Sequence, residues 1–117
     1  LFQEEGDRDF RGIKDKLAAF IAQAPFPVIV KETGFGFAPD ELAFLASIGA
    51  RYIDVAGKGG ANWILIEGWR SGTIDAAYEF ADWGYSTAEM LKKVPNRVYC
   101  LLPEVSALLM TSLLRLV

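Results

Sequence analysis

Two short β-branched runs, separated by a segment of helix length, constrain this chain more than any other feature. The first is PVIVKE at 27–32 and the second is RYIDVAG at 51–57. Runs of this kind are typical of strands that are buried on both faces of a parallel sheet. A helix that joins two such strands is almost always a right-handed crossover. The stretch 28–67 therefore predicts a βαβ unit of an α/β fold.

One helix is expected before the first strand in the sequence, and another after it. Apolar residues recur at helical spacing over 9–23, which predicts an amphipathic helix with one buried stripe, and Asp7 or Asp9 could cap its start. A second helix is expected over 39–48, where Gly49 would close it. The stripe of the first helix consists of Phe10, Ile13, Leu17, Phe20 and Ile21.

The pattern after the second strand is less decisive. WILIEGW at 63–69 fits either a short strand or the start of a helix, because apolar periodicity does not separate the two over so few residues. The following segment, 73–80, looks helical, and the DWG turn ends it. The type of the first of these two segments is left open by the sequence.

A further helix and a third strand are expected near the end. Ser86 or Thr87 would cap a helix that runs to about Val94, with Glu89 completing a capping box. RVYCLL at 97–102 is a third run of the parallel-strand type, bounded by prolines. The chain therefore predicts an α/β fold with about three parallel strands and intervening helices.

Composition narrows the classes of function. The 117 residues leave room for one domain, and a formal net charge of −3 argues against a general nucleic-acid binder. The sequence has no histidine, which removes His-based metal sites and Ser–His or Cys–His nucleophile pairs. The lone Cys100 suits a reducing cytosol, and the most apolar run, 105–114, is too short to span a bilayer. We expect a cytoplasmic protein with no membrane partner.

Several residues stand where parallel strands should end. Lys31 is either a solvated lysine or a cation aimed at a phosphate or at the N1–C2 carbonyl region of a flavin. Gly57, Gly59 and Gly60 permit close backbone approach to a ligand and leave N–H groups free for an anion. Most glycine-rich stretches of this length are simply tight turns, so the glycines alone are a weak signal.

The acidic and aromatic candidates are equally ambiguous. Glu32 and Glu67 could be general bases or metal ligands, although carboxylates on surface loops are usually solvated. The three tryptophans are more often core or lid residues than cofactor stackers. They are Trp63, Trp69 and Trp83.

Five motifs, taken in order, are more specific than any of them alone. They are EGDRDF (5–10), PVIVKETGFG (27–36), IDVAGKGGANW (53–63), an IE pair (66–67) and DWGYSTAEML (82–91). In this order the chain resembles the type 2 isopentenyl-diphosphate isomerases, the FMN-dependent family of the isoprenoid pathway. The resemblance implies a (β/α)₈ TIM barrel, of which this chain would carry about three strands, and assembly into homotetramers or octamers.

The resemblance also implies an activity. The family interconverts isopentenyl and dimethylallyl diphosphate by adding and removing protons, with no net redox change. It needs reduced FMN, which NADPH keeps reduced, and Mg²⁺.

Site residues carry over only where the motifs match. Lys31 matches the lysine that contacts FMN, and Glu67 matches an acidic residue implicated in the proton chemistry or in positioning the flavin. Ala61 stands where the family has a threonine, so a hydroxyl that helps to hold FMN is missing. The expected set is Trp63 and Glu67 for catalysis, and Lys31, Gly59, Gly60, Ala61 and Asn62 for cofactor binding, with no metal ligand in this chain.

The two ends of the chain depart from the family. The metal-binding glutamate and catalytic glutamine of the family lie just upstream of EGDRDF, so Gln3 and Glu4 are not those residues. The tail, 103–117, lacks the SGGIR turn that binds the FMN phosphate, but a two-base shift of reading frame can yield G-I-R-x-P-x-D-I, the family's own motif. We therefore expect a single fragment over 1–117, family-like to residue 102 and inactive alone.

Two other classes of protein remain open on the sequence. Another FMN-dependent barrel oxidoreductase would share the lysine and the glycine turn, but it would be expected to use a histidine or cysteine near the flavin. A non-catalytic remnant is the other alternative, and tight FMN binding would argue against it.

Overall fold

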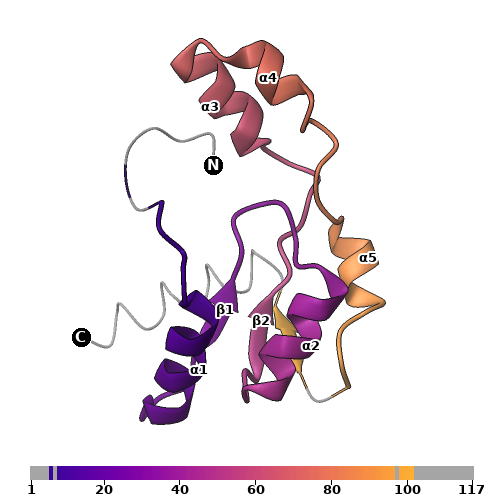
Figure 1. The fold of residues 1–117 in the computed structure, drawn as a ribbon. Coiled ribbons are helices and arrows are strands. Elements are labelled where there is room, and N and C mark those ends of the chain that lie inside the picture. Colours follow the sequence, from indigo (N-terminus) through magenta and orange to yellow (C-terminus); the bar gives the residue numbers. More distant parts are fainter. Residues whose placement is uncertain (1–5, 7, 97, 102–117) are drawn as a thin grey trace, which may run out of the picture.

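The computed structural model describes residues 6, 8–96 and 98–101, which form a parallel sheet with helices around it (Figure 1). Its three strands pair in chain order, β1–β2–β3, and both pairs are parallel. This confirms the predicted α/β fold, and the strand order is that of consecutive strands of a barrel wall. The elements are α1 (Ile13–Gln23), β1 (Ile29–Lys31), α2 (Pro39–Ser47), β2 (Tyr52–Asp54), α3 (Trp63–Ser71), α4 (Ile74–Tyr78), α5 (Thr87–Leu91) and β3 (Tyr99–Leu101).

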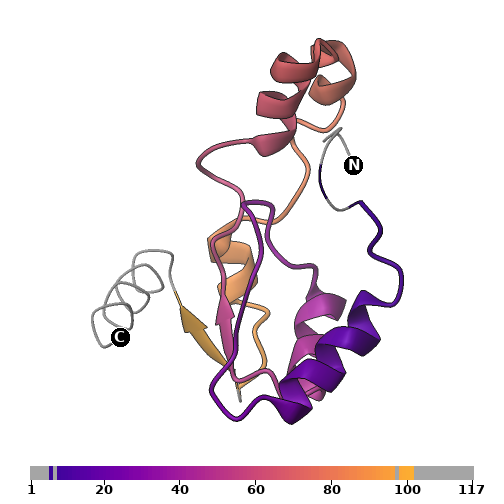
Figure 2. The ribbon, with the colours of Figure 1, turned by 90° about the vertical axis from the view of Figure 1, so that its left-hand side faces the viewer.

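The hydrophobic core lies on one side of the sheet. Figure 2 shows α1 and α2 on that same side. Ile53 and Val55 are fully buried there, and because side chains alternate along a strand, Tyr52 and Asp54 lie on the opposite face. The buried cluster consists of Leu42, Leu45, Ala50, Ile53, Val55 and Met90.

The first helix differs from its prediction in two respects. It begins at Ile13, after Gly12, and has no side-chain cap. Asp9 instead turns back on Arg11, with its carboxylate 2.7 Å from the guanidinium, and this contact lowers the pKa of Asp9. The other proposed cap, Asp7, lies outside the described residues.

The predicted buried stripe of α1 was also largely wrong. Only Leu17 and Ile21 pack against the core cluster. Phe10, Ile13 and Phe20 are about half exposed, because the described residues place no further strand or helix over that part of the helix. The helical spacing of apolar residues predicts which face of a helix could be buried. Whether that face is buried depends on the other elements that pack against it.

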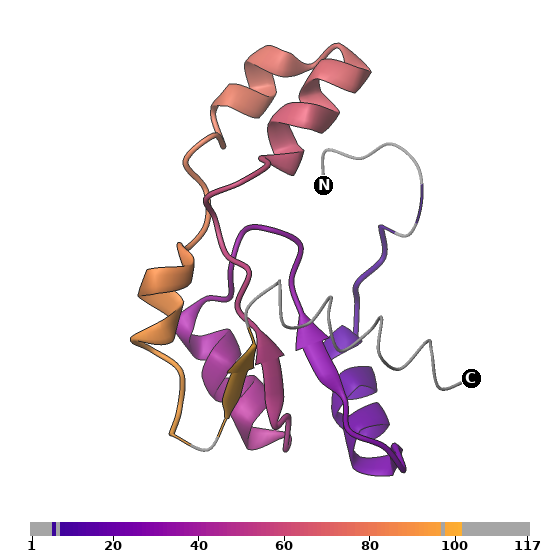
Figure 3. The same cartoon turned by 180° about the vertical axis from the view of Figure 1, so that it is seen from behind.

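The open segment at 63–69 proved to be helical. It forms α3, which packs on α4 as a hairpin that stands apart from the sheet, as Figure 3 shows from behind. Gly68 permits this close packing, since a Cβ there would collide with Ala77. The predicted capping box of α5 is confirmed, with Ser86 and Glu89 as its members, although the helix ends at Leu91, before the expected Val94.

Candidate functional site

A pocket of about 570 Å³ opens where β1 and β2 end. The carboxyl ends of parallel strands are where α/β folds build their sites. The pocket is lined by Lys31, Glu32, Thr33, Gly34, Ala56, Gly57, Gly60, Ala61, Trp63 and Glu67. A separate pocket of about 380 Å³ lies at the other end of the strands and contains none of the predicted site residues.

Five of the seven predicted site residues line this one pocket, whereas Gly59 and Asn62 do not. The sequence had missed Thr33, Gly34 and Ala56 as lining residues. Their signal was positional: Thr33 and Gly34 follow the first predicted strand directly, and Ala56 lies at the end of the second. The pocket thus brings the candidates together, while their roles in binding and catalysis stay predictions.

Glu32 is not the solvated carboxylate that its loop position suggested. Its Oε2 accepts hydrogen bonds from the backbone N–H groups of three successive residues, the last of them Gly36 at 2.8 Å. Its Oε1 accepts another from Gly57 N at 3.0 Å. One carboxylate therefore fills a nest of N–H groups and joins the loop after β1 to the loop after β2.

Lys31 ends β1 beside this carboxylate. Its Nζ donates to the carbonyl oxygen of Glu32 at 2.6 Å, and no ion pair to it is found within the described residues. An ammonium carries three N–H donors, so two remain for a ligand. Lys31 is therefore a cation at the pocket wall with donors to spare.

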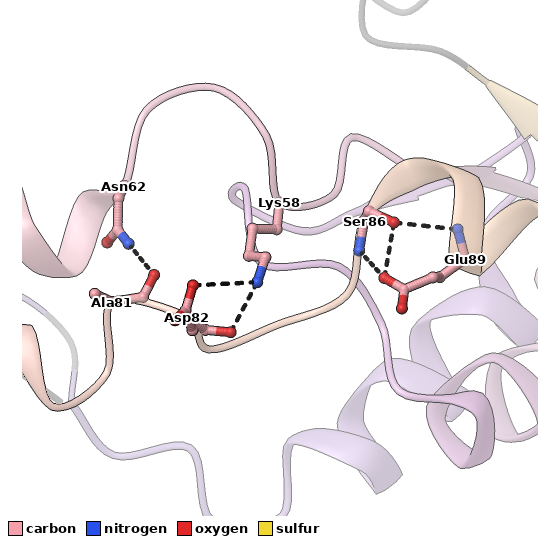
Figure 4. Close-up of polar contacts among 6 residues, drawn as sticks. All are labelled: Lys58, Asn62, Ala81, Asp82, Ser86 and Glu89. Carbon is pink, nitrogen blue, oxygen red and sulfur yellow. Dashed lines mark hydrogen bonds and ion pairs between the residues drawn. The ribbon is translucent and has the colours of Figure 1, made fainter.

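Hydrogen bonds with the segment 82–87 hold the glycine turn that follows β2. Thr87 Oγ1 donates to Ala56 O at 2.7 Å, and Lys58 N donates to Tyr85 O at 2.7 Å. Figure 4 shows Lys58 Nζ reaching Asp82, with its carbonyl oxygen at 2.9 Å and its carboxylate at 3.9 Å. These contacts hold the floor of the pocket against the segment that leads into α5.

Asn62 stabilises the start of α3, whatever contact it makes with a ligand. Its Oδ1 accepts from Leu65 N at 3.1 Å and so caps α3, while its Nδ2 donates to Ala81 O at 2.9 Å (Figure 4). Both ends of the amide are thus occupied in the described part of the chain. The cofactor contact predicted for Asn62 would have to use the second N–H of Nδ2 or the second lone pair of Oδ1.

Removing the Asn62 side chain is expected to loosen the α3–α4 hairpin. Asn62→Ala loses a helix cap and a bond to Ala81, so the free energy of unfolding should fall by about 1–2 kcal/mol. Urea denaturation followed by circular dichroism measures this loss. Thr73→Ala is the matched control, because Thr73 precedes α4 without a side-chain cap and its hydroxyl bonds only Ser71 Oγ among the described residues, at 2.7 Å. An equal loss in both variants would contradict the capping role.

Trp63 and Glu67 lie on successive turns of α3 and face the pocket. Trp63 is half exposed, and a methyl group placed on Gly34 would meet its ring at 3.5 Å, so the indole lies against the loop after β1. Glu67 Oε2 is paired with Arg70 at 2.9 Å, and its Oε1 has no partner within the residues described. A free carboxylate oxygen beside an aromatic wall suits proton transfer or ligand positioning.

The described residues carry neither a metal-ligand cluster nor a membrane-spanning helix. No group of three His, Cys, Asp or Glu side chains gathers there as a metal site would require. None of the helices in that part of the chain is both long and apolar enough to cross a membrane.

Parallel strands joined by helices, with a pocket at their carboxyl ends, are typical of α/β enzyme domains, the (β/α)₈ barrels among them. No family model matches the chain. Curated proteins do match the chain, and the three described next share one name. The chain is a relative of these isopentenyl-diphosphate delta-isomerases.

Three of these relatives show how far the similarity extends. The isomerase of Borrelia garinii subsp. bavariensis is 48% identical over 84 residues, which are 72% of this chain and 24% of the relative. That of Symbiobacterium thermophilum is 42% identical over 108 residues, 92% of this chain and 27% of the relative. That of Xanthobacter autotrophicus is 45% identical over 94 residues, 79% and 27% respectively. The chain thus spans about a quarter of the length of the curated relatives that it matches.

Proposed function

We propose that this chain carries one wall of the flavin site of a type 2 isopentenyl-diphosphate isomerase, which interconverts isopentenyl and dimethylallyl diphosphate. The observation that supports this most is the gathering of Lys31, Gly60, Ala61, Trp63 and Glu67 around one pocket. The name shared by the relatives supports the same reaction. In this proposal the enzyme is cytoplasmic, uses FMN, NADPH and Mg²⁺, and assembles as a homotetramer or homo-octamer.

The pocket fits one side of FMN. Its volume of about 570 Å³ lies in the range of small-molecule sites, and it combines a cation, a half-exposed indole and open backbone at Gly60. The described residues offer no second cation to this pocket, so they supply a flavin wall and leave the phosphate to other parts of the enzyme. Ala61 contributes only a methyl group where the family has a hydroxyl.

When bound, reduced FMN would supply acid–base chemistry for the proton addition and removal that interconvert the two diphosphates. Lys31 would place its ammonium against the negative charge of the reduced ring. Trp63 would exclude water from the wall nearest Gly34. Glu67 would hold a proton on Oε1 while Arg70 orients the carboxylate through Oε2.

Lys31 gives the direct test of the flavin wall. Lys31→Met should weaken FMN binding by about tenfold, since a charge-assisted hydrogen bond contributes about that factor. Titration of the full chain with FMN, followed by quenching of flavin fluorescence, measures it. Lys92→Met is the control, because Lys92 is exposed and lies outside the pocket. Equal affinities of the two variants would contradict the proposed contact.

The isomerase half of the proposal needs its own assay. Isopentenyl diphosphate, FMN, NADPH and Mg²⁺ are supplied, and dimethylallyl diphosphate is followed as product. The 117-residue chain alone is expected to show no measurable turnover, because the described residues form one wall of the site. Robust turnover by this chain would overturn that expectation, and failure to bind FMN would favour a non-catalytic remnant.

The other flavin class is less well supported. An oxidoreductase of this type would be expected to use a reactive thiol or imidazole near the flavin. Burial raises the pKa of Cys100, which keeps it a thiol, and Cys100 does not line the pocket.

A further inference from the structure

Asp54 is an unexplained buried charge. It is the last residue of β2 and is only 1% exposed, and among the described residues no other charged side chain is buried. Its Oδ1 is buried, and none of the described residues offers it a hydrogen bond. A buried carboxylate oxygen without a donor is costly, so each such atom in a folded protein calls for a partner.

The register of the sheet identifies the neighbour of Asp54. Lys31 of β1 is its in-register partner, and adjacent strands run about 4.8 Å apart. Val30 and Ile53 pack into the core on the helix side. Alternation therefore places Lys31 and Asp54 together on the opposite face. Opposite charges directly across two strands attract each other.

Three other cations among the described residues have partners or lie elsewhere. Lys58 lies against Asp82, and Arg70 against Glu67. Arg51 precedes β2, at the opposite end of the strand from Asp54. Lys31 by contrast donates only to the carbonyl oxygen of Glu32, through a long stem that can turn.

We propose that Asp54 is a positioning residue for Lys31. Its carboxylate accepts an N–H from the Lys31 ammonium when the lysine stem turns inward, and so keeps the cation at the rim of the pocket until an anionic ligand draws it outward. The pair itself follows from register and burial. Its consequence for flavin binding rests on the proposed function.

Selective acetylation of lysines tests the pair without any ligand. The full chain is treated briefly with limiting acetic anhydride, and mass spectrometry gives the labelling of Lys31 relative to Lys92. A carboxylate that holds the ammonium shields its nitrogen from the reagent. Asp54→Asn should therefore raise the ratio about fivefold, the change in an equilibrium that one such interaction produces. An unchanged ratio would overturn the proposal.

Two controls separate pairing from general loosening. Asp82→Asn removes a carboxylate from the neighbourhood of Lys58 and should leave the Lys31 ratio unchanged. Global destabilisation would raise the labelling of Lys31 and Lys92 alike, so the ratio would not move. A rise of the ratio in both variants would count against the specific pair.

Urea denaturation tests the pair even if Asp54→Asn alone fails to fold. Lys31→Met leaves the buried carboxylate without its cation, so its urea midpoint should fall below that of Lys92→Met. Adding Asp54→Asn to Lys31→Met should raise the midpoint again, because the unpaired charge is gone. Additive losses would overturn the pair. If the chain binds no FMN and the labelling ratio still rises, the proposed function fails and the pair remains.

Discussion

Glu32→Gln is expected to lower the free energy of unfolding by about 2–3 kcal/mol, although the side chain keeps its size. The carboxylate accepts N–H groups at both oxygens, with Gly36 on one and Gly57 on the other. An amide has only one acceptor oxygen, so its NH₂ group must face an N–H donor at one end. The loss combines that unsatisfied donor with the charge assistance of the others.

The same substitution should also disturb the pocket. Glu32 joins the loops after β1 and β2, and Lys31 is its immediate neighbour in the chain. We expect FMN binding to weaken together with stability. Urea denaturation by circular dichroism and flavin titration measure the two effects separately.

The control for this prediction is Glu79→Gln. Glu79 is exposed at the end of α4, so the same chemical change should alter stability by no more than about 0.5 kcal/mol. If Glu32→Gln were as mild as this control, the four N–H bonds would not be holding the two loops together. An equal midpoint would therefore contradict the loop-joining role.

Local sequence signals predicted the parts of the fold that depend on a few adjacent residues. The three apolar runs became β1, β2 and β3, and the Ser86–Glu89 capping box formed as expected. The stripe of α1 failed at Phe20 and its neighbours, because burial requires another element over the helix. WILIEGW became a helix that Asn62 caps and α4 packs against, and neither feature can be read from its apolar period.

The site was predictable to the extent that strand ends determine it. Lys31 was placed by its position at the end of a strand, and the resemblance to the isomerase family supplied Trp63 and Glu67. Glu32 was misjudged because one of its partners, Gly57, lies 25 residues away and meets it only in the folded chain. Asp54 gave no signal at all, since a charged residue in a strand does not reveal its burial.

Gly57→Ala is expected to lower the free energy of unfolding by about 3 kcal/mol, from backbone strain and overpacking together. Gly57 has a φ of +60°, a conformation that L-residues rarely adopt. A Cβ there would lie 2.5 Å from Thr87 N and 2.8 Å from Met90 Cε. It would push α5 away from the loop after β2 and strain the bond from Thr87 Oγ1 to Ala56 O.

Gly49→Ala separates the two causes of that loss. Gly49 also has a positive φ, of +85°, but nothing lies within 4 Å of a Cβ placed there. Its loss should reflect strain alone, about 1 kcal/mol. The remainder for Gly57→Ala then measures how tightly α5 packs under the pocket floor, and it should appear as weaker FMN binding in that variant only. Equal losses in the two variants would mean that the floor yields to a methyl group and does not fix the position of the Glu32 carboxylate.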